Sequence, residues 1–311
     1  MARIRIPAIV AALVLTAAAC ASGSGHAAAP TTTTNPELAS VPPGPVTHVQ
    51  LPFEDRSRPA VDPIGVRSAP TRMLPTELYL PSGKGRRPLV IFAHGYDGDP
   101  AKFTELLGHW AAAGFVVAAP RFPITYTGAA AGPLARAGDI AQQPRDMTFV
   151  LDRLLAGKYA SRIDRTRIGA AGLSLGGGTT WGLVTDRNHL DKRIRAAIVM
   201  DGNRFGFGDD TYVQNRIPVL VYHADHDYSL PFASAQKDYA RLAPPKYFVT
   251  LFETVHAQPY ENDPDPADDM VRQSSVDFWR AYLLGDAKAR SEIVATATVP
   301  GVSTAESVPG R

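Results

Sequence analysis

The feature that most constrains this chain is a series of short, wholly apolar segments that alternate with longer amphipathic ones. Residues 88–93 (PLVIFA) and 115–119 (FVVAA) are typical of the short segments. A strand that is apolar on both faces must be covered on both sides, as happens when helices lie on each face of a parallel sheet. The pattern therefore predicts an α/β fold with a doubly wound, mostly parallel sheet flanked by helices.

The same pattern sets the expected order of elements. Further core strands are expected at 167–171, 196–200, 219–222 and 247–252, and an early antiparallel edge strand at 76–80. Helices are expected at 101–113, 142–156, 176–186, 232–241 and 268–284. Repeated strand–helix units of this kind predict a single domain, which we place at residues 46–298.

Both ends of the 311-residue chain depart from this pattern. Residues 1–19 carry two arginines followed by an apolar run too short to cross a bilayer, which predicts an export signal. Small residues precede Cys20, as in a bacterial lipobox, although ordinary cleavage within an alanine-rich stretch would explain the same pattern. Residues 20–45 are rich in Ala, Gly, Ser, Thr and Pro and predict a flexible tether, and 299–311 predict a disordered tail. We expect a lipoprotein on the outer face of the cell membrane, or otherwise an extracellular protein.

Charge and cysteine usage exclude several classes of protein. The formal net charge is only +2 and no basic stripe is present, so nucleic acid is not an expected partner. Cys20 is the single cysteine. The folded domain therefore has neither an internal disulfide nor a cysteine nucleophile. A lipid anchor is the only membrane attachment expected.

The segment Gly172–Gly176 (GLSLG) lies between a predicted strand and a glycine-rich helix start. A tight strand-to-helix turn of this kind lifts a serine hydroxyl above the sheet, and the glycines on either side avoid backbone clashes. The turn predicts Ser174 as a nucleophile.

A serine nucleophile needs a histidine to take its proton and a carboxylate to orient that histidine. The strand at 219–222 runs into His223-Ala224-Asp225-His226-Asp227, where two carboxylates compete for this role. His256 follows the last predicted core strand and fits the role of base better than the other histidines do.

Ester chemistry also needs N–H donors for the developing oxyanion. The amide of Leu175, directly after the nucleophile, is one candidate, and the amide of Tyr96 in the loop 94–98 is the other. Aromatic residues near these loops either contact the substrate or pack the loops onto the core. The candidates for substrate contact are Tyr96, Phe122, Tyr126, Phe205 and Tyr228.

Residues 92–96 (FAHGY), 164–178 (DRTRIGAAGLSLGGG) and 224–227 (ADHD) resemble bacterial cutinases and polyester hydrolases of the α/β-hydrolase superfamily. The stretch 143–152 resembles predicted dienelactone hydrolases and the platelet-activating-factor acetylhydrolase group. The resemblance implies Asp227 as the acid, because these families place a proline four residues after it, as Pro231 is here. It also implies hydrolysis of a small-molecule or polymeric carboxylic ester without any cofactor.

The chain departs from these families in several respects. It lacks the cysteine nucleophile of true dienelactone hydrolases and the C-terminal disulfide common in polyester hydrolases. Asp201-Gly202-Asn203 stands where polyester hydrolases usually carry an aromatic residue. The segment 201–216 is also short, which predicts that no large lid domain is inserted there.

Other readings of the sequence remain open. A thioesterase, an amidase or a cofactor-free haloperoxidase would use the same residues, and a non-catalytic surface binding protein could keep the same scaffold. The acidic run 263–269 suits either Ca²⁺ or the N-terminus of the next helix, and we predict no metal site.

Overall fold

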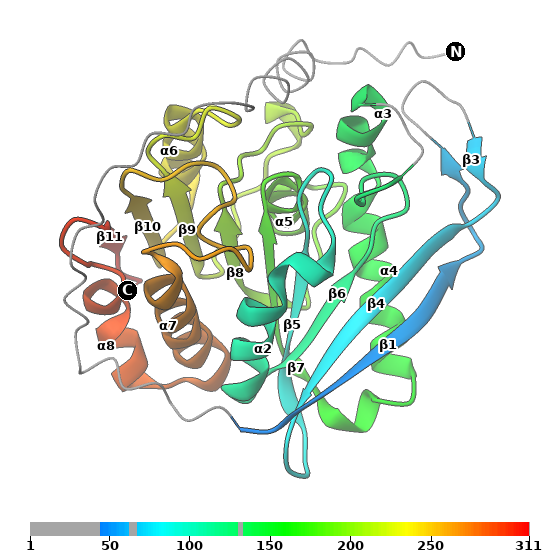
Figure 1. Cartoon of the computed structure of the whole chain (residues 1–311), viewed down its shortest axis with the longest axis horizontal. Helices are drawn as coiled ribbons and strands as arrows, with labels where there is room; N and C mark the ends of the chain where they lie inside the picture. Colours follow the sequence, from blue (N-terminus) through cyan, green and yellow to red (C-terminus); the bar gives the residue numbers. More distant parts are fainter. Residues whose placement is uncertain (1–43, 62–66, 130–132, 311) are drawn as a thin grey trace.

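The computed structural model describes residues 44–61, 67–129 and 133–310. The predicted signal peptide, Cys20 and nearly all of the tether lie outside these residues. Within them, nine strands form one mixed sheet in the order β1-β4-β6-β5-β7-β8-β9-β10-β11, with helices on both faces (Figure 1). This confirms the predicted doubly wound, mostly parallel sheet.

The centre of the sheet is parallel and its two edges are antiparallel. The parallel strands are β5 (Arg87–Ala93), β6 (Val116–Pro120), β7 (Ile163–Leu173), β8 (Ile194–Met200), β9 (Val219–Ala224) and β10 (Lys246–Leu251). The antiparallel strands are β1 (Val46–Asp55), β4 (Arg72–Pro81) and β11 (Ser303–Val308), and β2 (Ala60–Val61) pairs with β3 (Arg67–Ala69) in a separate ribbon.

The helices form two layers, one on each face of the sheet (Figure 1). One layer contains α2 (Thr104–Ala112), α7 (Asp268–Trp279) with its π-helical extension η5 (Arg280–Leu284), and α8 (Ala287–Thr296). The other contains α4 (Gln143–Ala156), α5 (Leu175–Thr185) and α6 (Phe232–Arg241). Short helical segments are α3 (Pro133–Gly138), η1 (Pro100–Phe103), η2 (Asp139–Ala141), η3 (Ala160–Arg162) and η4 (Asp209–Thr211).

Strand β5 shows why its sequence is apolar throughout. Val90 and Phe92 enter the core cluster on the side of α2 and α7, while Leu89 and Ile91 enter the cluster on the side of α4 and α5. Successive side chains of a strand point to opposite faces, so each face of β5 is buried by its own helical layer.

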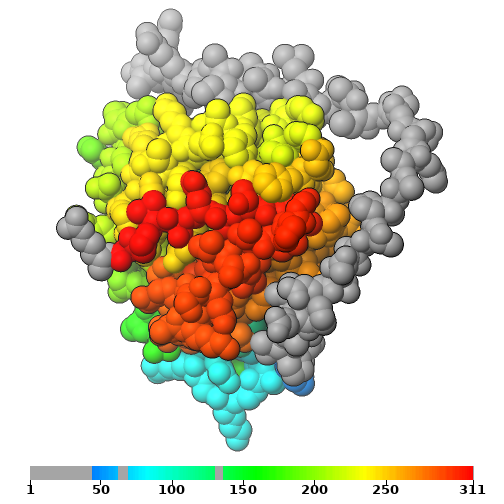
Figure 2. Space-filling view, turned by 90° about the vertical axis from the view of Figure 1, so that its left-hand side faces the viewer, coloured from blue at the N-terminus to red at the C-terminus, as the bar shows by residue number. Residues whose placement is uncertain are grey.

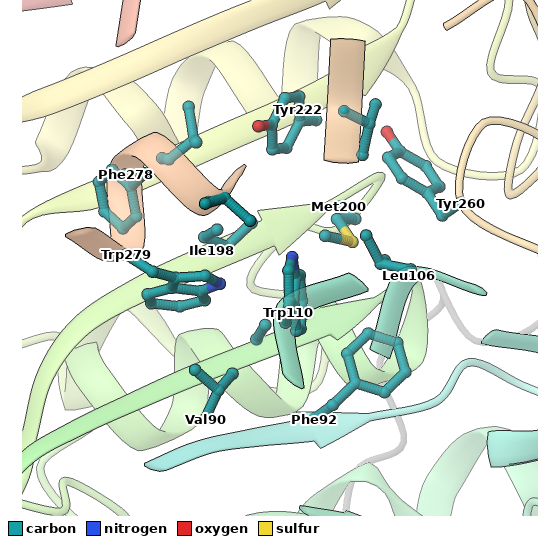
Figure 3. Close-up of a cluster of buried hydrophobic side chains, with 14 of the residues drawn as sticks. Val90, Phe92, Leu106, Trp110, Ile198, Met200, Tyr222, Tyr260, Phe278 and Trp279 are labelled. Carbon is teal, nitrogen blue, oxygen red and sulfur yellow. The ribbon is translucent and has the colours of Figure 1, made fainter. Parts of the chain in front are cut away.

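Aromatic side chains form the centre of the core between the sheet and α2 and α7 (Figure 3). The rings of Trp110 and Trp279 meet edge to face, with centroids 5.7 Å apart. Trp110 is fully buried, and its indole N–H donates to Ser275 Oγ at 2.8 Å. Edge-to-face packing with a satisfied indole donor fixes α7, whose preceding loop carries His256.

Two predictions about the sheet edges were wrong. β4 was expected at an edge, but it lies between β1 and β6, and β1 forms the edge instead. The expected disordered tail also forms a strand, because residues 303–308 pair antiparallel with β10. Figure 2 shows the C-terminal residues, in red, lying along the surface of the domain. A strand at the sheet edge gains its stability from backbone hydrogen bonds to one neighbour, so its sequence needs no apolar run.

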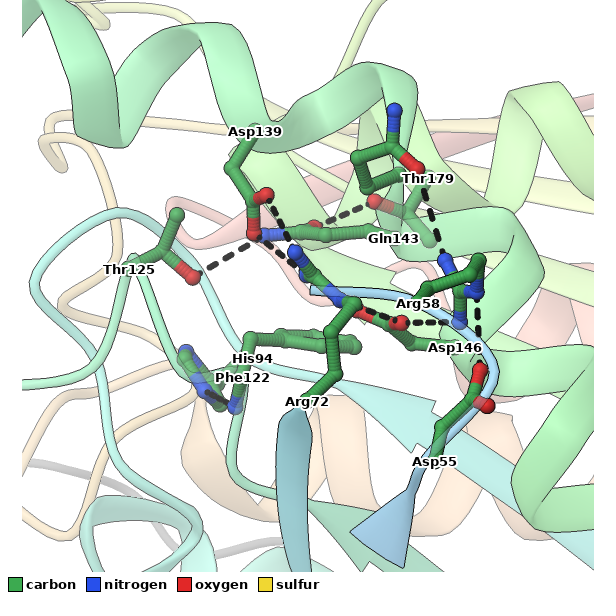
Figure 4. A network of polar contacts seen from close by, with 11 residues as sticks. Asp55, Arg58, Arg72, His94, Phe122, Thr125, Asp139, Gln143, Asp146 and Thr179 are labelled. Atoms are coloured by element: carbon green, nitrogen blue, oxygen red, sulfur yellow. Dashed lines mark hydrogen bonds and ion pairs between the residues drawn. The ribbon is translucent and has the colours of Figure 1, made fainter. Parts of the chain in front are cut away.

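A buried ionic network joins β4 to η2 and to the first turn of α4 (Figure 4). The guanidinium of Arg72, with no exposed surface, donates to Asp139 at 2.9–3.0 Å and to Asp146 at 2.5–2.8 Å. Arg58 pairs with Asp146 at 2.7 Å. Burial raises the pKa of Asp139 to about 7, against the opposing effect of Arg72. The network holds η2 in place, and Ile140 of η2 packs against Leu175 beside the predicted nucleophile.

Residues 201–218, between β8 and β9, contain only the short helix η4 among the described residues. The described chain therefore has no large lid domain at this point, as predicted. Across the described ranges, no helix has the length and apolar character needed to cross a membrane.

Candidate active site

Ser174 occupies a strained turn between β7 and α5. Its φ of 55° and ψ of −116° are unusual for a residue with a side chain. The turn is held by hydrogen bonds from the Ser174 amide to Met200 O and from the Gly178 amide to Ser174 O, both 2.9 Å. The strain is maintained by the surrounding structure and places the hydroxyl at the N-terminus of α5, where the helix dipole favours negative charge.

The turn fits against its neighbours only because glycines surround it. A Cβ on Gly176 would overlap the carbonyl oxygen of Ala93, and a Cβ on Gly177 would lie 2.9 Å from Gly202 Cα. A Cβ on Gly95 would lie 3.2 Å from Ser174 Cβ. The loop after β5 therefore lies directly against the serine.

That loop, which carries Tyr96, is held by His94. The imidazole is fully buried, and burial lowers its pKa to about 4, so the ring is neutral near pH 7. Its Nε2 accepts the Phe122 N–H at 3.1 Å, so Nδ1 carries the proton and donates to Gly95 O at 2.8 Å. His94 thus fixes the loop that carries Tyr96 and that lies against Ser174 at Gly95.

Asp227 and His256 contact each other directly. Asp227 Oδ2 lies 2.7 Å from His256 Nδ1, while Asp227 Oδ1 accepts the amides of Ser229 and Leu230, each at 2.8 Å. The carboxylate is thereby fixed, and it orients the imidazole with its Nε2 available for other contacts. The competing Asp225 is half-buried, and the structure places Asp227, not Asp225, against the histidine.

The surroundings of His256 favour its protonated form. Burial works in the opposite direction, but the hydrogen bond to Asp227 and the charges of Asp201, Asp227 and Glu261 raise the pKa of His256 above its ordinary value. About a fifth of the His256 side chain remains exposed. The described residues show no hydrogen bond between His256 and Ser174 Oγ; such contacts are often looser before substrate binds.

Sequence reasoning missed Asp201, which lies at the end of β8. Its carboxylate is fully buried and accepts the amides of Ala224 at 2.8 Å and Ala257 at 3.2 Å. One oxygen each of Asp201 and Asp227 and one nitrogen of His256 all lie within 4.8 Å of one another. The available signal is an aspartate immediately after a core strand, at the position where polyester hydrolases usually carry an aromatic residue.

The predicted substrate-contacting aromatics fall into different environments. Phe205 is 9% exposed and belongs to a small apolar cluster with Leu175, against which Tyr96 packs. Tyr228 is 77% exposed beside Asp227. Tyr126 is half-buried under the guanidinium of Arg121. Phe122 was wrongly grouped with them, because it has no exposed surface and packs on His94, 4.9 Å between ring centroids.

The group Asp201, Asp227 and His256 has a spacing that could suit a metal ion. However, all four carboxylate oxygens already face N–H donors or the imidazole. The acidic run 263–269 makes contacts within its own segment. Asp265 accepts a hydrogen bond from the Ala267 amide at 2.8 Å, and Asp268 and Asp269 lie in the first turn of α7. These contacts account for both acidic groups through hydrogen bonding and the helix terminus.

A comparison with protein-family models supplies independent evidence. The family described as Chlorophyllase matches residues 56–231, more than half of the chain. The chain belongs to the chlorophyllase family. This family is part of the α/β-hydrolase superfamily, which confirms the superfamily inferred from the sequence. The chlorophyllase match includes Ser174 and Asp227 and ends before His256. No curated protein matches the chain.

Membership of the chlorophyllase family makes the chain a hydrolase, and it implies a small-molecule substrate. Within the matched range lie the Tyr96 loop, the strained serine turn and the fixed Asp227.

Proposed function

We propose that this protein is an exported serine esterase that cleaves small carboxylic esters through Ser174, His256 and Asp227. The observation that carries this proposal is the 2.7 Å contact between Asp227 Oδ2 and His256 Nδ1, with the other Asp227 oxygen held by two amides. Such a contact fixes the imidazole tautomer that leaves Nε2 unprotonated and able to accept a proton.

In the proposed first step, Ser174 Oγ attacks the ester carbonyl carbon while its proton passes to His256 Nε2. The carbonyl oxygen becomes an oxyanion, which accepts hydrogen bonds from the Leu175 and Tyr96 amides. Each donor of this type stabilises the transition state by roughly 3 kcal/mol. Leu175 is the first residue of α5, whose first-turn amides have no partner within the helix.

The tetrahedral intermediate then collapses. The bond to the alcohol oxygen breaks, and the alcohol leaves with the proton from His256, which leaves the acyl group on Ser174. A water molecule attacks the acyl carbon and gives its proton to His256. Release of the acid returns that proton to Ser174 Oγ, so the enzyme ends as it began. Asp227 stabilises the imidazolium in both steps without being protonated.

A panel of p-nitrophenyl esters of increasing acyl length tests the proposal, with Ser174→Ala as the control. Chlorophyll is added as a further ester because the family is named for it. We expect turnover of at least the short esters, loss of turnover in Ser174→Ala, and covalent labelling of the wild type by a fluorophosphonate. A folded protein that neither turns over these esters nor reacts with the probe would instead be a binding protein on this scaffold.

Amide and thioester analogues of the best ester separate the remaining hydrolase classes. An esterase should favour the oxygen ester in kcat/KM. A preference for the amide or the thioester would reassign the substrate class while leaving the same three residues in place.

A further inference from the structure

Asp201 is a buried ionisable group that the mechanism above does not use. It follows β8 with a φ of 41°, a left-handed backbone that few residues with a side chain adopt. No part of its side chain is exposed. A buried carboxylate in a strained backbone is costly unless its contacts compensate for it, so those contacts indicate what it does.

The contacts of Asp201 join the two loops that carry the predicted acid and base. Its Oδ1 accepts the amide of Ala224, which ends β9 three residues before Asp227. Its Oδ2 accepts the amide of Ala257, the residue after His256. Ala257 itself has a φ of 72°, so the histidine loop is also held in a left-handed turn at this point.

Asp201 also adds charge to the same small volume. One of its oxygens lies within 4.8 Å of both an Asp227 oxygen and a His256 nitrogen. His223 lies between the two aspartates, with Nδ1 3.9 Å from Asp201 and Nε2 3.4 Å from Asp227. His223 Nε2 is also 2.9 Å from Leu230 O. Its N–H donates a hydrogen bond to that carbonyl, which leaves Nδ1 without a proton in the neutral ring.

We propose that Asp201 is a second carboxylate of the active site, which positions the acid and histidine loops together and electrostatically favours the protonated form of His256. Asp227 remains the direct partner, and Asp201 acts through the two loops and through its charge. This inference rests on the proposed function of His256 as the base. Asp225 lies on the same loop as Asp227, but among the described residues it neither accepts hydrogen bonds from the acid and histidine loops nor belongs to the group of Asp201, Asp227 and His256.

The charged groups around His256 are Asp227 in direct contact, Asp201 beneath the loop and Glu261 further along the same segment, all of which raise its pKa. Burial acts against them. The buried phenol of Tyr260 lies near Asp201, and burial raises its pKa well above the ordinary value, so it stays neutral. Removing the charge of Asp201 should therefore lower the pKa of His256 while Asp227 and Glu261 remain.

The test is a histidine NMR titration of wild type, Asp201→Asn and the matched control Asp225→Asn. The His256 signal is identified by its absence in His256→Gln. Asparagine has nearly the same shape as aspartate and also tolerates a left-handed backbone, so the first variant mainly removes charge. We expect the His256 midpoint to fall by about one pH unit in Asp201→Asn, as a unit charge at this distance predicts, and to stay unchanged in Asp225→Asn.

Kinetics give a second readout. The acid limb of kcat/KM should move to lower pH with the NMR midpoint in Asp201→Asn, and kcat at the optimum should fall about tenfold with little change in KM. If Asp201→Asn is too unstable, Asp201→Gly removes the same charge at a φ that glycine accepts, and it should shift the midpoint in the same direction.

An unchanged His256 midpoint in the folded charge-removing variant would overturn the proposal and leave Asp201 as a purely structural link between loops. A loss of kcat in Asp201→Asn as large as in Asp227→Asn would also overturn it, because Asp201 would then be the acid itself. The NMR comparison needs no turnover. Retained activity in Ser174→Ala would contradict the proposed function and leave the titration result interpretable.

Discussion

Ser174 and His256 act in a single chemical step in the proposed mechanism, so their contributions to the rate should not be independent. Ser174→Ala removes the attacking atom, and His256→Ala removes the proton acceptor. Each is expected to lower kcat by a factor on the order of 10⁶, and the double variant should be scarcely worse than either. Steady-state hydrolysis of one ester, after circular dichroism shows that each variant is folded, provides the measurement. Losses that multiply in the double variant would contradict a shared step.

Asp227 and Asp225 form a natural pair for testing the acid, because they are two residues apart on one loop and only Asp227 contacts His256. Asp227→Asn should leave the fold intact and lower kcat by about 10⁴, since the imidazole loses its orienting acceptor. Asp225→Asn should change kcat only a few-fold. Both are measured with the same ester at saturating concentration. A larger effect from Asp225→Asn would show that the acid was assigned to the wrong residue.

The ionisation of His256 sets the expected pH dependence. The imidazole must be neutral to accept the serine proton, so kcat/KM should rise with pH through its ionisation. Because hydrogen bonding to Asp227 and the surrounding carboxylates raise the pKa of His256, the midpoint should lie above the ordinary histidine value of about 6.5. A pH series of kcat/KM for a non-ionisable ester measures it. A midpoint well below that value would mean that burial outweighs the carboxylates.

At the scale of the elements, the ionic network between β4 and η2 offers a stability prediction. Arg72→Leu leaves Asp139 and Asp146 buried without their shared cation, and it should lower the free energy of unfolding by about 3–5 kcal/mol. The control is Arg56→Leu, which alters a pair with Glu54 in which the arginine side chain is 82% exposed, and it should leave the denaturation midpoint nearly unchanged. Chemical denaturation of both variants is the measurement. Equal midpoints for the two would show that the network contributes little.

Elements with a strong local pattern could be predicted, and elements that depend on a neighbour could not. The core strands could be recognised in the sequence because both of their faces are buried, as in Val219–Ala224, and such strands are apolar throughout. The edge strands Val46–Asp55 and Ser303–Val308 were not visible, because they expose many side chains and are defined by pairing with β4 and β10. Helix Ala287–Thr296 was missed for a similar reason, since only Ala289 and Ile293 are buried in it.

The candidate site divides in the same way. Ser174 could be predicted because its turn needs a local glycine pattern, and His256 because it follows a core strand. Asp201 also follows a core strand, but its role could not be predicted from that position, because it depends on the amides of Ala224 and Ala257, which are distant in sequence and meet it only in the folded sheet. Local motifs therefore identify the reacting groups more readily than the groups that position them.

At the scale of the whole molecule, the predicted tether determines how the domain would sit relative to a membrane. If residues 20–45 form the flexible tether that their composition predicts, a segment of that length has an average reach of roughly 30 Å. If Cys20 is lipidated, the domain would stay within about one domain diameter of the bilayer.

Lipidation of Cys20 is tested by fractionation. The wild-type protein expressed in a bacterium should partition with membranes, because a lipid attached at the new N-terminus holds it there. Cys20→Ala should be released into the soluble exported fraction or remain as uncleaved precursor. Cys20→Ser keeps the size of the side chain and should behave in the same way. Identical partitioning of wild type and both variants would exclude the anchor.

The close approach of backbone around the serine turn also limits how the gene for this protein can vary. Every missense change at a glycine codon introduces a Cβ, and at Gly172 and Gly176 that atom would overlap a carbonyl oxygen of the neighbouring backbone. No choice of replacement residue avoids the overlap. By contrast, Gly108 has open space at the Cβ position, so many codon changes there should be tolerated. Random mutagenesis should therefore find no active substitutions at the first two codons and many at the third.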